Sequence, residues 1–185
     1  MTLPTNRRKG PRMTSTQPIL VLTTGGTIDK QYFDASSQYT IVGTVVTRLL
    51  ELGRVLHPFQ VEEVMRKDSL EMDDADRAKI AARVAASDAA RIVITHGTDT
   101  MTETAKALAG IVGKTIVLVG ALAPARFAES DATFNLGMAF ATVQVAQPGV
   151  YITMNGTVFE ASDVQEAHGA MCAARWTPAQ GRGDA

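Results

Sequence analysis

The stretch I-L-V-L-T-T-G-G-T-I at residues 19–28 decides the fold, because it joins a buried strand to a glycine turn. The strand is a run of aliphatic residues, and the two glycines let the backbone turn sharply and approach a ligand. A second stretch, I-V-I-T-H-G-T-D-T at residues 92–100, repeats this order. In an open parallel sheet, the carboxyl ends of the strands line one edge, where ligands bind. The sequence therefore predicts two hydroxyl-rich turns that meet across a small pocket, which is equipment for acyl transfer.

Strand and helix patterns alternate along the chain. This alternation predicts an α/β fold, a three-layer Rossmann-like domain with a mainly parallel sheet. A polar loop is expected over residues 25–40. Asn155-Gly156 marks a tight turn, so Thr157–Phe159 is expected to pair back as a C-terminal β-hairpin, followed by a helical tail from about Asp163. The expected strands are residues 19–22, 59–65, 91–95, 115–119 and 149–154, and the expected helices are 42–52, 73–85, 101–112 and 134–145.

The composition is that of one globular domain. The chain has 185 residues, 45% of them hydrophobic, and a formal net charge of −1. We interpret residues 1–17 as a disordered leader, 18–176 as the domain and 177–185 as a flexible tail. The net charge gives no electrostatic basis for binding nucleic acid or an anionic membrane, and no apolar run reaches the roughly 20 residues that span a bilayer. The basic residues of the leader leave a nucleic-acid-binding arm as an alternative.

Metal-binding and redox groups are few. Cys172 is the single cysteine, which excludes an internal disulfide and suits a reducing, cytoplasmic compartment. His57, His96 and His168 show no metal-ligand spacing. We therefore expect neither a metal nor an organic cofactor.

The first turn offers a candidate nucleophile. Gly26 allows close approach of a ligand, and Thr27 projects at the sheet edge as a nucleophile or a ligand clamp. A nucleotide-binding fingerprint needs a glycine spacing that is absent here. A threonine hydroxyl attacks only after losing its proton, and the phenols of Tyr32 and Tyr39 in the polar loop are the candidate acceptors. The alternative for each tyrosine is that its ring simply packs over the pocket.

The second turn and the end of the second strand offer ligand contacts. Gly97 brings the backbone close, Thr98 can polarise a water, and Asp99 can hold an ammonium group. The alternative is that Asp99 caps the helix that follows. Ser69 and Glu71 lie at the same expected edge, where Ser69 can bind a carboxylate, although either is also an ordinary surface turn residue.

Several of these segments together resemble the bacterial L-asparaginase family, the threonine amidohydrolases. The specific matches are T-G-G-T-I at 24–28 and H-G-T-D-T-M at 96–101. Supporting matches are Y-T-I-V-G at 39–43, D-S-x-E-M at 68–72, V-G-A-L-x-P at 119–124 and D-A-T-F-N-L at 131–136. The resemblance covers roughly residues 17 to 165. It implies a Rossmann-like N-terminal domain that hydrolyses L-asparagine to L-aspartate and ammonia.

The resemblance also implies roles. Thr27 would be the nucleophile that forms an acyl-enzyme, and Tyr39 the loop tyrosine, with Tyr32 the alternative in a short form. Ser69, Thr98 and Asp99 would bind the substrate's α-carboxylate and α-amino groups, with Thr98 in the second catalytic group. Backbone N–H groups, including that of Thr98, would receive the oxyanion, and losing one such donor costs about 3 kcal/mol.

Three departures from the family pattern stand out. The family is usually nearly twice as long and has a second, smaller domain. Leu70 stands where the family has a substrate-binding glutamine, and Glu166 where it has the lysine of its Thr-Asp-Lys group. A glutamate beside Asp99 weakens the binding of an anionic substrate.

The sequence predicts a short, cytoplasmic asparaginase-like amidohydrolase that acts on a small amino-acid amide as a homodimer or higher homo-oligomer. A non-catalytic amino-acid-binding protein with a degenerate site is the main alternative, favoured by Leu70 and Glu166. A nucleotide-binding module is a second alternative and rests on fold class alone.

Overall fold

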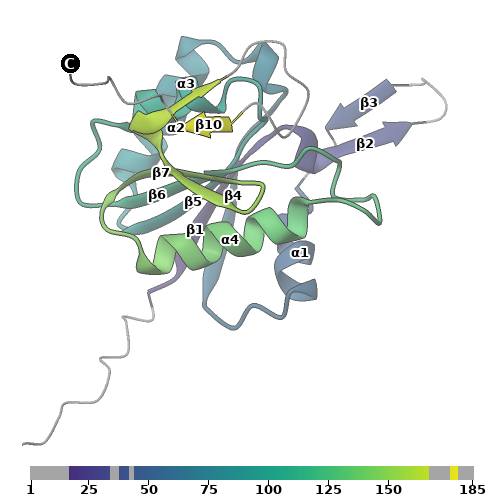
Figure 1. Ribbon diagram of the computed structural model, residues 1–185, viewed down its shortest axis with the longest axis horizontal. Helices are drawn as coiled ribbons and strands as arrows, with labels where there is room; N and C mark the ends of the chain where they lie inside the picture. The colour runs from purple at the N-terminus through teal and green to yellow at the C-terminus, as the bar shows by residue number, and fades with distance from the viewer. Residues whose placement is uncertain (1–16, 34–37, 42–43, 167–175, 179–185) are drawn as a thin grey trace, which may run out of the picture.

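The chain folds around a six-stranded sheet with strand order β4-β1-β5-β6-β7-β8 (Figure 1). The computed structural model describes residues 17–33, 38–41, 44–166 and 176–178, with side chains for 17–30 and 44–162. Five strands run parallel and β8 runs antiparallel to β7, which confirms the predicted fold class and its C-terminal hairpin. The sheet strands are β1 (Ile19–Gly25), β4 (Phe59–Lys67), β5 (Arg91–Thr95), β6 (Thr115–Val119), β7 (Gly149–Met154) and β8 (Thr157–Glu160).

Helices cover both faces of the sheet and make three layers (Figure 1). Successive residues of a strand point to opposite faces, so Leu20 and Leu22 of β1 pack with one helical layer while Ile19 and Val21 pack with the other. The first layer holds α2 (Asp74–Ala86) and α3 (Met101–Leu108), and the second holds α1 (Val46–Leu52) and α4 (Ala132–Val145). Because both faces are covered, the central strands β1, β5 and β6 contain continuous aliphatic runs.

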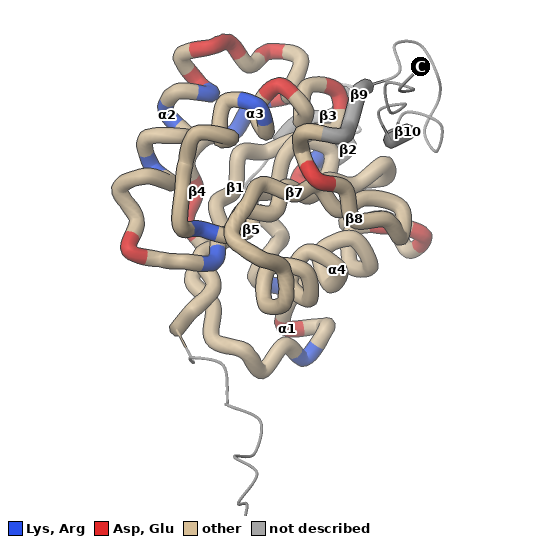
Figure 2. Tube along the Cα trace, turned by 60° about the vertical axis from the view of Figure 1, so that its left-hand side comes forward, with Lys and Arg blue, Asp and Glu red and all other residues tan. Residues whose placement is uncertain are grey.

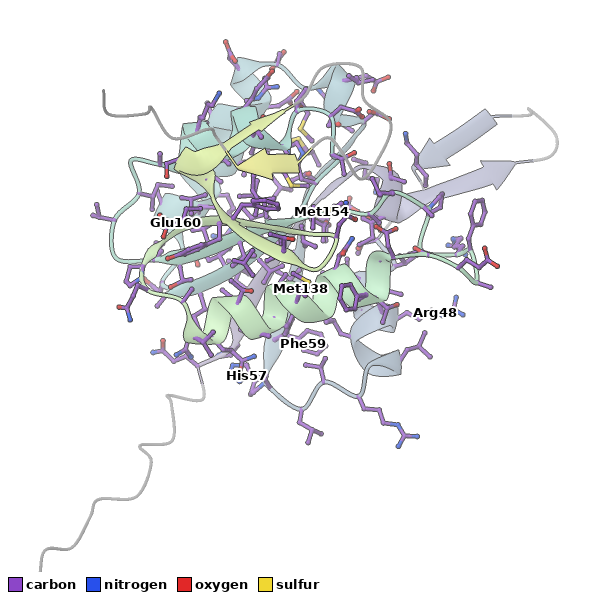
Figure 3. All side chains as sticks on the ribbon, viewed as in Figure 1. Arg48, His57, Phe59, Met138, Met154 and Glu160 are labelled. Carbon is purple, nitrogen blue, oxygen red and sulfur yellow. The ribbon has the colours of Figure 1, made fainter. Side chains whose placement is uncertain are left out.

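Helix starts and packing follow from particular residues. Asp73 and Asp76 form a reciprocal capping box that begins α2. Phe59 of β4 lies between α4 and α1 (Figure 3) and meets the ring of Phe140 edge-on, with centroids 6.2 Å apart. The turn between β7 and β8 needs positive φ at both central residues, and Asn155 (51°) and Gly156 (80°) supply it.

Two local predictions were wrong. The expected polar loop after Gly25 contains a 3₁₀ turn, η1 (Thr27–Asp29), and an antiparallel hairpin of β2 (Lys30–Phe33) and β3 (Gln38–Ile41). The expected C-terminal helix is absent over 163–166 and 176–178, where a short 3₁₀ turn leads into β9 (Val164–Glu166), which pairs with β10 (Trp176–Pro178). In both places, backbone hydrogen bonds between two strands outweigh the local helical or loop pattern.

The predicted leader up to residue 16, Cys172, His168 and the tail beyond residue 178 lie outside the described residues. Within the described part, no helix is long and apolar enough to cross a membrane. The described side chains also contain no group of histidine, cysteine and carboxylate residues that could hold a metal ion.

Candidate active site at the carboxyl edge of the sheet

The carboxyl ends of β4, β1, β5 and β6 bring three turns into direct contact. Gly26 donates its N–H to the carbonyl of Lys67 at 3.1 Å, which joins the first turn to the end of β4. An added Cβ at Gly26 would meet the backbone of Gly97, with 2.7 Å to its Cα. A Cβ at Gly97 would in turn meet the side chain of Ser69, with 2.7 Å to its Cβ. The predicted meeting of the two glycine turns is therefore observed, and Ser69 joins them.

Glycine is the only residue type that suits position 26. Its φ of 80° and ψ of −171° belong to a backbone region that residues other than glycine essentially never adopt. This conformation ends β1 abruptly and starts η1, so that Thr27 lies at the first position after the close contact with Gly97. Thr27 is half-buried, whereas Ile28 behind it is fully buried. The turn thus anchors the chain through Ile28 and leaves the Thr27 side chain within reach of solvent.

The second turn follows β5. Thr98 is buried at 5% exposure, while Asp99 and Thr100 are half-buried. The hydroxyl of Thr100 donates to the carbonyl of Ser69 at 2.8 Å, so the second turn and the end of β4 hold each other. Behind them, Gly120 after β6 leaves no room for a Cβ, which would lie 2.7 Å from the carbonyl oxygen of His96. The second turn is therefore tied to the turn after β4 through Thr100, and Thr98 packs against Gly120 at the end of β6.

Ser69 presents a buried hydroxyl to this contact. Its side chain has no exposed surface, and its Oγ has no hydrogen-bond partner among the described residues. A buried hydroxyl without a partner costs about 1–3 kcal/mol, so such a group calls for a ligand or a water. On the same 3₁₀ turn, η2 (Ser69–Glu71), Glu71 is exposed and Leu70 is 72% exposed. Of the residues expected at the end of β4, Ser69 contacts the second glycine turn at Gly97, and Glu71 lies on the surface.

His96 supports the second turn from within the core. Its Nδ1 lies 2.7 Å from the carbonyl oxygen of Gly97, and its Nε2 lies 2.8 Å from the hydroxyl of Thr104. A carbonyl only accepts, so Nδ1 carries the proton and Nε2 accepts from Thr104. Burial lowers the pKa of His96 to about 4. The imidazole is thus neutral near pH 7 and fixes the direction of the Gly97 carbonyl. This supporting role of His96 was not predicted from the sequence, where His96 was considered only as a metal ligand.

Asp29 supports the first turn and was also missed. Its carboxylate accepts a hydrogen bond from the Val45 N–H at 2.8 Å, across the whole of the β2–β3 segment. Burial raises the pKa of Asp29 to about 6, and the hydrogen bonds from Val45 and Thr44 only partly oppose this. The polar character of residue 29 directly after an aliphatic residue was a signal, but its distant partner was not visible in the sequence.

A third support comes from the segment after β6. Asp131 accepts hydrogen bonds from the N–H groups of Leu122 and Ala123, each at 3.0 Å. Asn135 donates to the Gly120 carbonyl at 3.1 Å. The N–H of Ala125 then donates to the carbonyl of Ile28 at 3.3 Å. The D-A-T-F-N-L segment therefore holds the loop after β6, and that loop is hydrogen-bonded to the Thr27 turn.

The two candidate tyrosines stand directly opposite each other. Tyr32 of β2 and Tyr39 of β3 are register partners in the hairpin that follows η1. Glu166 lies in β9, which contacts α3. The side chains of these three residues lie outside the described part of the structure. Their expected roles stay predictions.

Comparison with known proteins agrees with this geometry. The family model described as "Asparaginase, N-terminal" matches residues 18–181. The chain is 34% identical over 166 residues to L-asparaginase 2 of Escherichia coli, covering 81% of this chain and 46% of that protein. It is 30% identical over 164 residues to a glutaminase-asparaginase of Pseudomonas fluorescens, covering 80% and 45%.

Solved structures give the same result. A probable cytoplasmic L-asparaginase of Campylobacter jejuni superposes with a TM-score of 0.74 at 30% identity, covering 87% of this chain and 52% of that one. The thermostable L-asparaginase of Thermococcus kodakarensis gives 0.74 at 25%, covering 88% and 51%. The chain thus spans about half the length of the relatives it matches.

Proposed function

The chain belongs to the asparaginase family, and from that premise we propose that it hydrolyses L-asparagine to L-aspartate and ammonia through an acyl-enzyme on Thr27. The observation that carries the proposal is the contact of three turns at one sheet edge. Gly26, which precedes Thr27, packs against the backbone of Gly97, which precedes Thr98, and Gly97 packs against Ser69, whose hydroxyl has no partner among the described residues. This contact supports Thr27 as the nucleophile, Thr98 as the second hydroxyl and Ser69 as a substrate-binding group.

The reaction follows from these groups. The Thr27 hydroxyl oxygen attacks the carbon of the substrate's side-chain amide, while the phenol of Tyr39 or Tyr32 takes up the Thr27 proton and passes its own phenolic proton to the amide nitrogen. Backbone N–H groups at the second turn, including that of Thr98, stabilise the oxyanion. The tetrahedral intermediate breaks its C–N bond, ammonia leaves with the transferred proton, and Thr27 is left as an ester. A water polarised by Thr98 then cleaves the ester and restores the hydroxyl.

Substrate binding uses the same turns. Ser69 donates to the α-carboxylate and Asp99 accepts from the α-ammonium group, while Gly26 and Gly97 let the backbone approach. Glu71 is exposed at the rim of this region, where it can contact the ammonium group through solvent. Glu166 stands where the family has a lysine, and a carboxylate there is expected to weaken the binding of an anionic substrate.

We also propose that the protein acts in the cytoplasm and as a homo-oligomer. The single cysteine is consistent with the first proposal. The Campylobacter jejuni neighbour is titled cytoplasmic, whereas a Haemophilus influenzae relative is named periplasmic. Light scattering after size exclusion tests the second proposal, and a monomer at micromolar concentration would contradict it.

Ammonia release from L-asparagine tests the function. Thr27→Ala should lower kcat at least about 10³-fold, because it removes the nucleophile. Thr98→Ala should lower kcat about 10²-fold or more. Thr157→Ala, which changes an exposed threonine of the edge strand β8, is the control, because β8 carries none of the three turns, and the variant should retain activity. If the parent chain releases no ammonia from asparagine or glutamine but binds aspartate saturably, the chain is a binding protein instead.

A further inference from the structure

A lysine and an aspartate join the two turns that the proposed function assigns to nucleophile and substrate. The Nζ of Lys30, three residues after Thr27, lies 2.6 Å from an Oδ of Asp68, which directly precedes Ser69. Both side chains are largely buried, at 27% and 25% exposure. The pair therefore connects η1 to η2 across the edge of the sheet.

The carboxylate of Asp68 has two tasks. One oxygen receives the Lys30 ammonium, and the other accepts the Leu70 N–H at 3.2 Å, which caps the turn that carries Ser69. Burial by itself would raise the pKa of Asp68, but the hydrogen bonds from Lys30 and Leu70 hold it below its usual value. The carboxylate is thus ionised near pH 7, and its orientation sets both the start of η2 and the position of Lys30.

The other cations of this part of the molecule are already paired elsewhere. Lys67 pairs with Asp76 of α2 at 2.6 Å, Arg66 pairs with Glu63 of its own strand at 2.7 Å, and Arg77 pairs with Glu103 of α3. Figure 2 shows these charges around β4, α2 and α3, whereas α4 is free of charged residues. Among the salt bridges of the described residues, only that of Lys30 with Asp68 spans the first turn and the turn of Ser69.

We propose that Lys30 and Asp68 are a positioning pair, which sets the separation of Thr27 from Ser69 and so aligns the nucleophile with the bound amide. The proposal rests on the proposed function and adds to it a pair that contacts neither the reacting atoms nor the substrate. Its physical basis is that two reacting groups must be held within a fraction of an ångström, because a displacement of about 1 Å costs up to about 10²-fold in rate. The Gly26 N–H and the Asp29 carboxylate also hold the first turn. Removal of the Lys30–Asp68 pair should therefore misalign this turn rather than unfold it.

The test is a double-mutant cycle with a matched control. Lys30→Met removes the cation, and Asp68→Asn keeps an oxygen for the Leu70 N–H while removing the charge. Arg83→Met is the control, because Arg83 forms an ion pair with Glu62 at the same 2.6 Å, between α2 and the middle of β4. Lys30→Arg preserves the charge and is the rescue variant. Two readouts are measured: steady-state ammonia release, and hydrogen–deuterium exchange of segments 24–30 and 67–72.

We expect Lys30→Met and Asp68→Asn each to lower kcat about tenfold with KM changed less than about threefold, and the double variant to be no worse than either. Exchange in both segments should be faster, Lys30→Arg should recover most of kcat, and Arg83→Met should match the parent. Unchanged kcat and exchange in Lys30→Met would overturn the proposal. A loss confined to KM would overturn it as well, because Lys30 would then be a substrate contact.

The two proposals can fail separately. If the parent chain hydrolyses no amide, the proposed function fails, and the exchange data alone then decide the pairing. Faster exchange in both segments, in both variants but not in Arg83→Met, would still support a link between the two turns. Faster exchange in one segment alone would overturn it.

Discussion

Gly26→Ala should lower the free energy of unfolding more than any other addition of a single methyl group at the candidate site. Two separate costs follow from the structure. The φ of 80° and ψ of −171° lie in a region closed to alanine, which costs about 1–3 kcal/mol. The new Cβ would also lie 2.7 Å from the Gly97 Cα, about 1 Å inside the ordinary 3.5–4.0 Å separation of two carbons. Relieving that overlap means moving backbone, at about 1–3 kcal/mol.

Gly113→Ala separates these two costs. Gly113 has a similar φ of 77°, but an added Cβ there meets no atom within 4 Å. Its substitution should therefore cost only the conformational strain, about 1–2 kcal/mol. Gly26→Ala should exceed it by at least about 1 kcal/mol, for a total of about 2–6 kcal/mol, and should also abolish ammonia release.

Urea unfolding followed by far-ultraviolet circular dichroism measures both variants. If the free energies of unfolding of the two variants agree within about 1 kcal/mol, the close contact between the two glycine turns is refuted. If Gly26→Ala does not fold at 25 °C, Gly97→Ala gives a milder version of the same test. Its Cβ would meet the Ser69 side chain, whose hydroxyl can rotate away but whose Cβ, 2.7 Å away, moves only with the backbone of η2, so a cost of about 1–3 kcal/mol is expected.

The pH dependence of stability should contain two opposing contributions. Asp29 has its pKa raised by burial to about 6 from a usual 3.8, so its folded form holds a proton that the unfolded chain has lost, and stability falls by about 3 kcal/mol as pH rises through this range. His96 has its pKa lowered by burial to about 4 from 6.5, so stability falls by about 3 kcal/mol as pH drops from 6.5 to 4. Urea unfolding at pH 4.5 and 7 measures both contributions. Asp29→Asn should be more stable than the parent mainly at pH 7, and His96→Gln should lose less stability than the parent on acidification. Parallel profiles for all three proteins would contradict both assignments. Asn135→Leu should lower the free energy of unfolding by about 2–4 kcal/mol. It leaves the Gly120 carbonyl and the Asn155 N–H, in the turn between β7 and β8, without their Asn135 partner. Gln144→Leu is its control, since that half-buried amide bonds within its own helix and should cost under about 1 kcal/mol, and equal losses in the two variants would show that the Asn135 amide is not a structural link.

Local sequence determined the sheet and the two glycine turns. Aliphatic runs such as Ile92–Ile94 fit only strands buried on both faces, and the alternation with helical spacing leaves a parallel sheet as the consistent fold. Asn155-Gly156 specified its turn because few residues accept positive φ twice in succession. The segments at 24–28 and 96–101 could be placed together from sequence, because parallel strands end at one common edge.

Only the tertiary structure decided how the site is held. The partners of Asp29, His96 and Lys30 lie 16, 8 and 38 residues away, and no local periodicity records which side chain a buried group will meet. The pairing of β2 with β3 and of β9 with β10 escaped prediction for the same reason, since a ladder's hydrogen bonds are made between segments rather than within one. Periodicity and turn chemistry are local properties and can be read along the chain. Burial, pairing and shifted pKa values arise when distant segments exclude water together, so they exist only in the folded molecule.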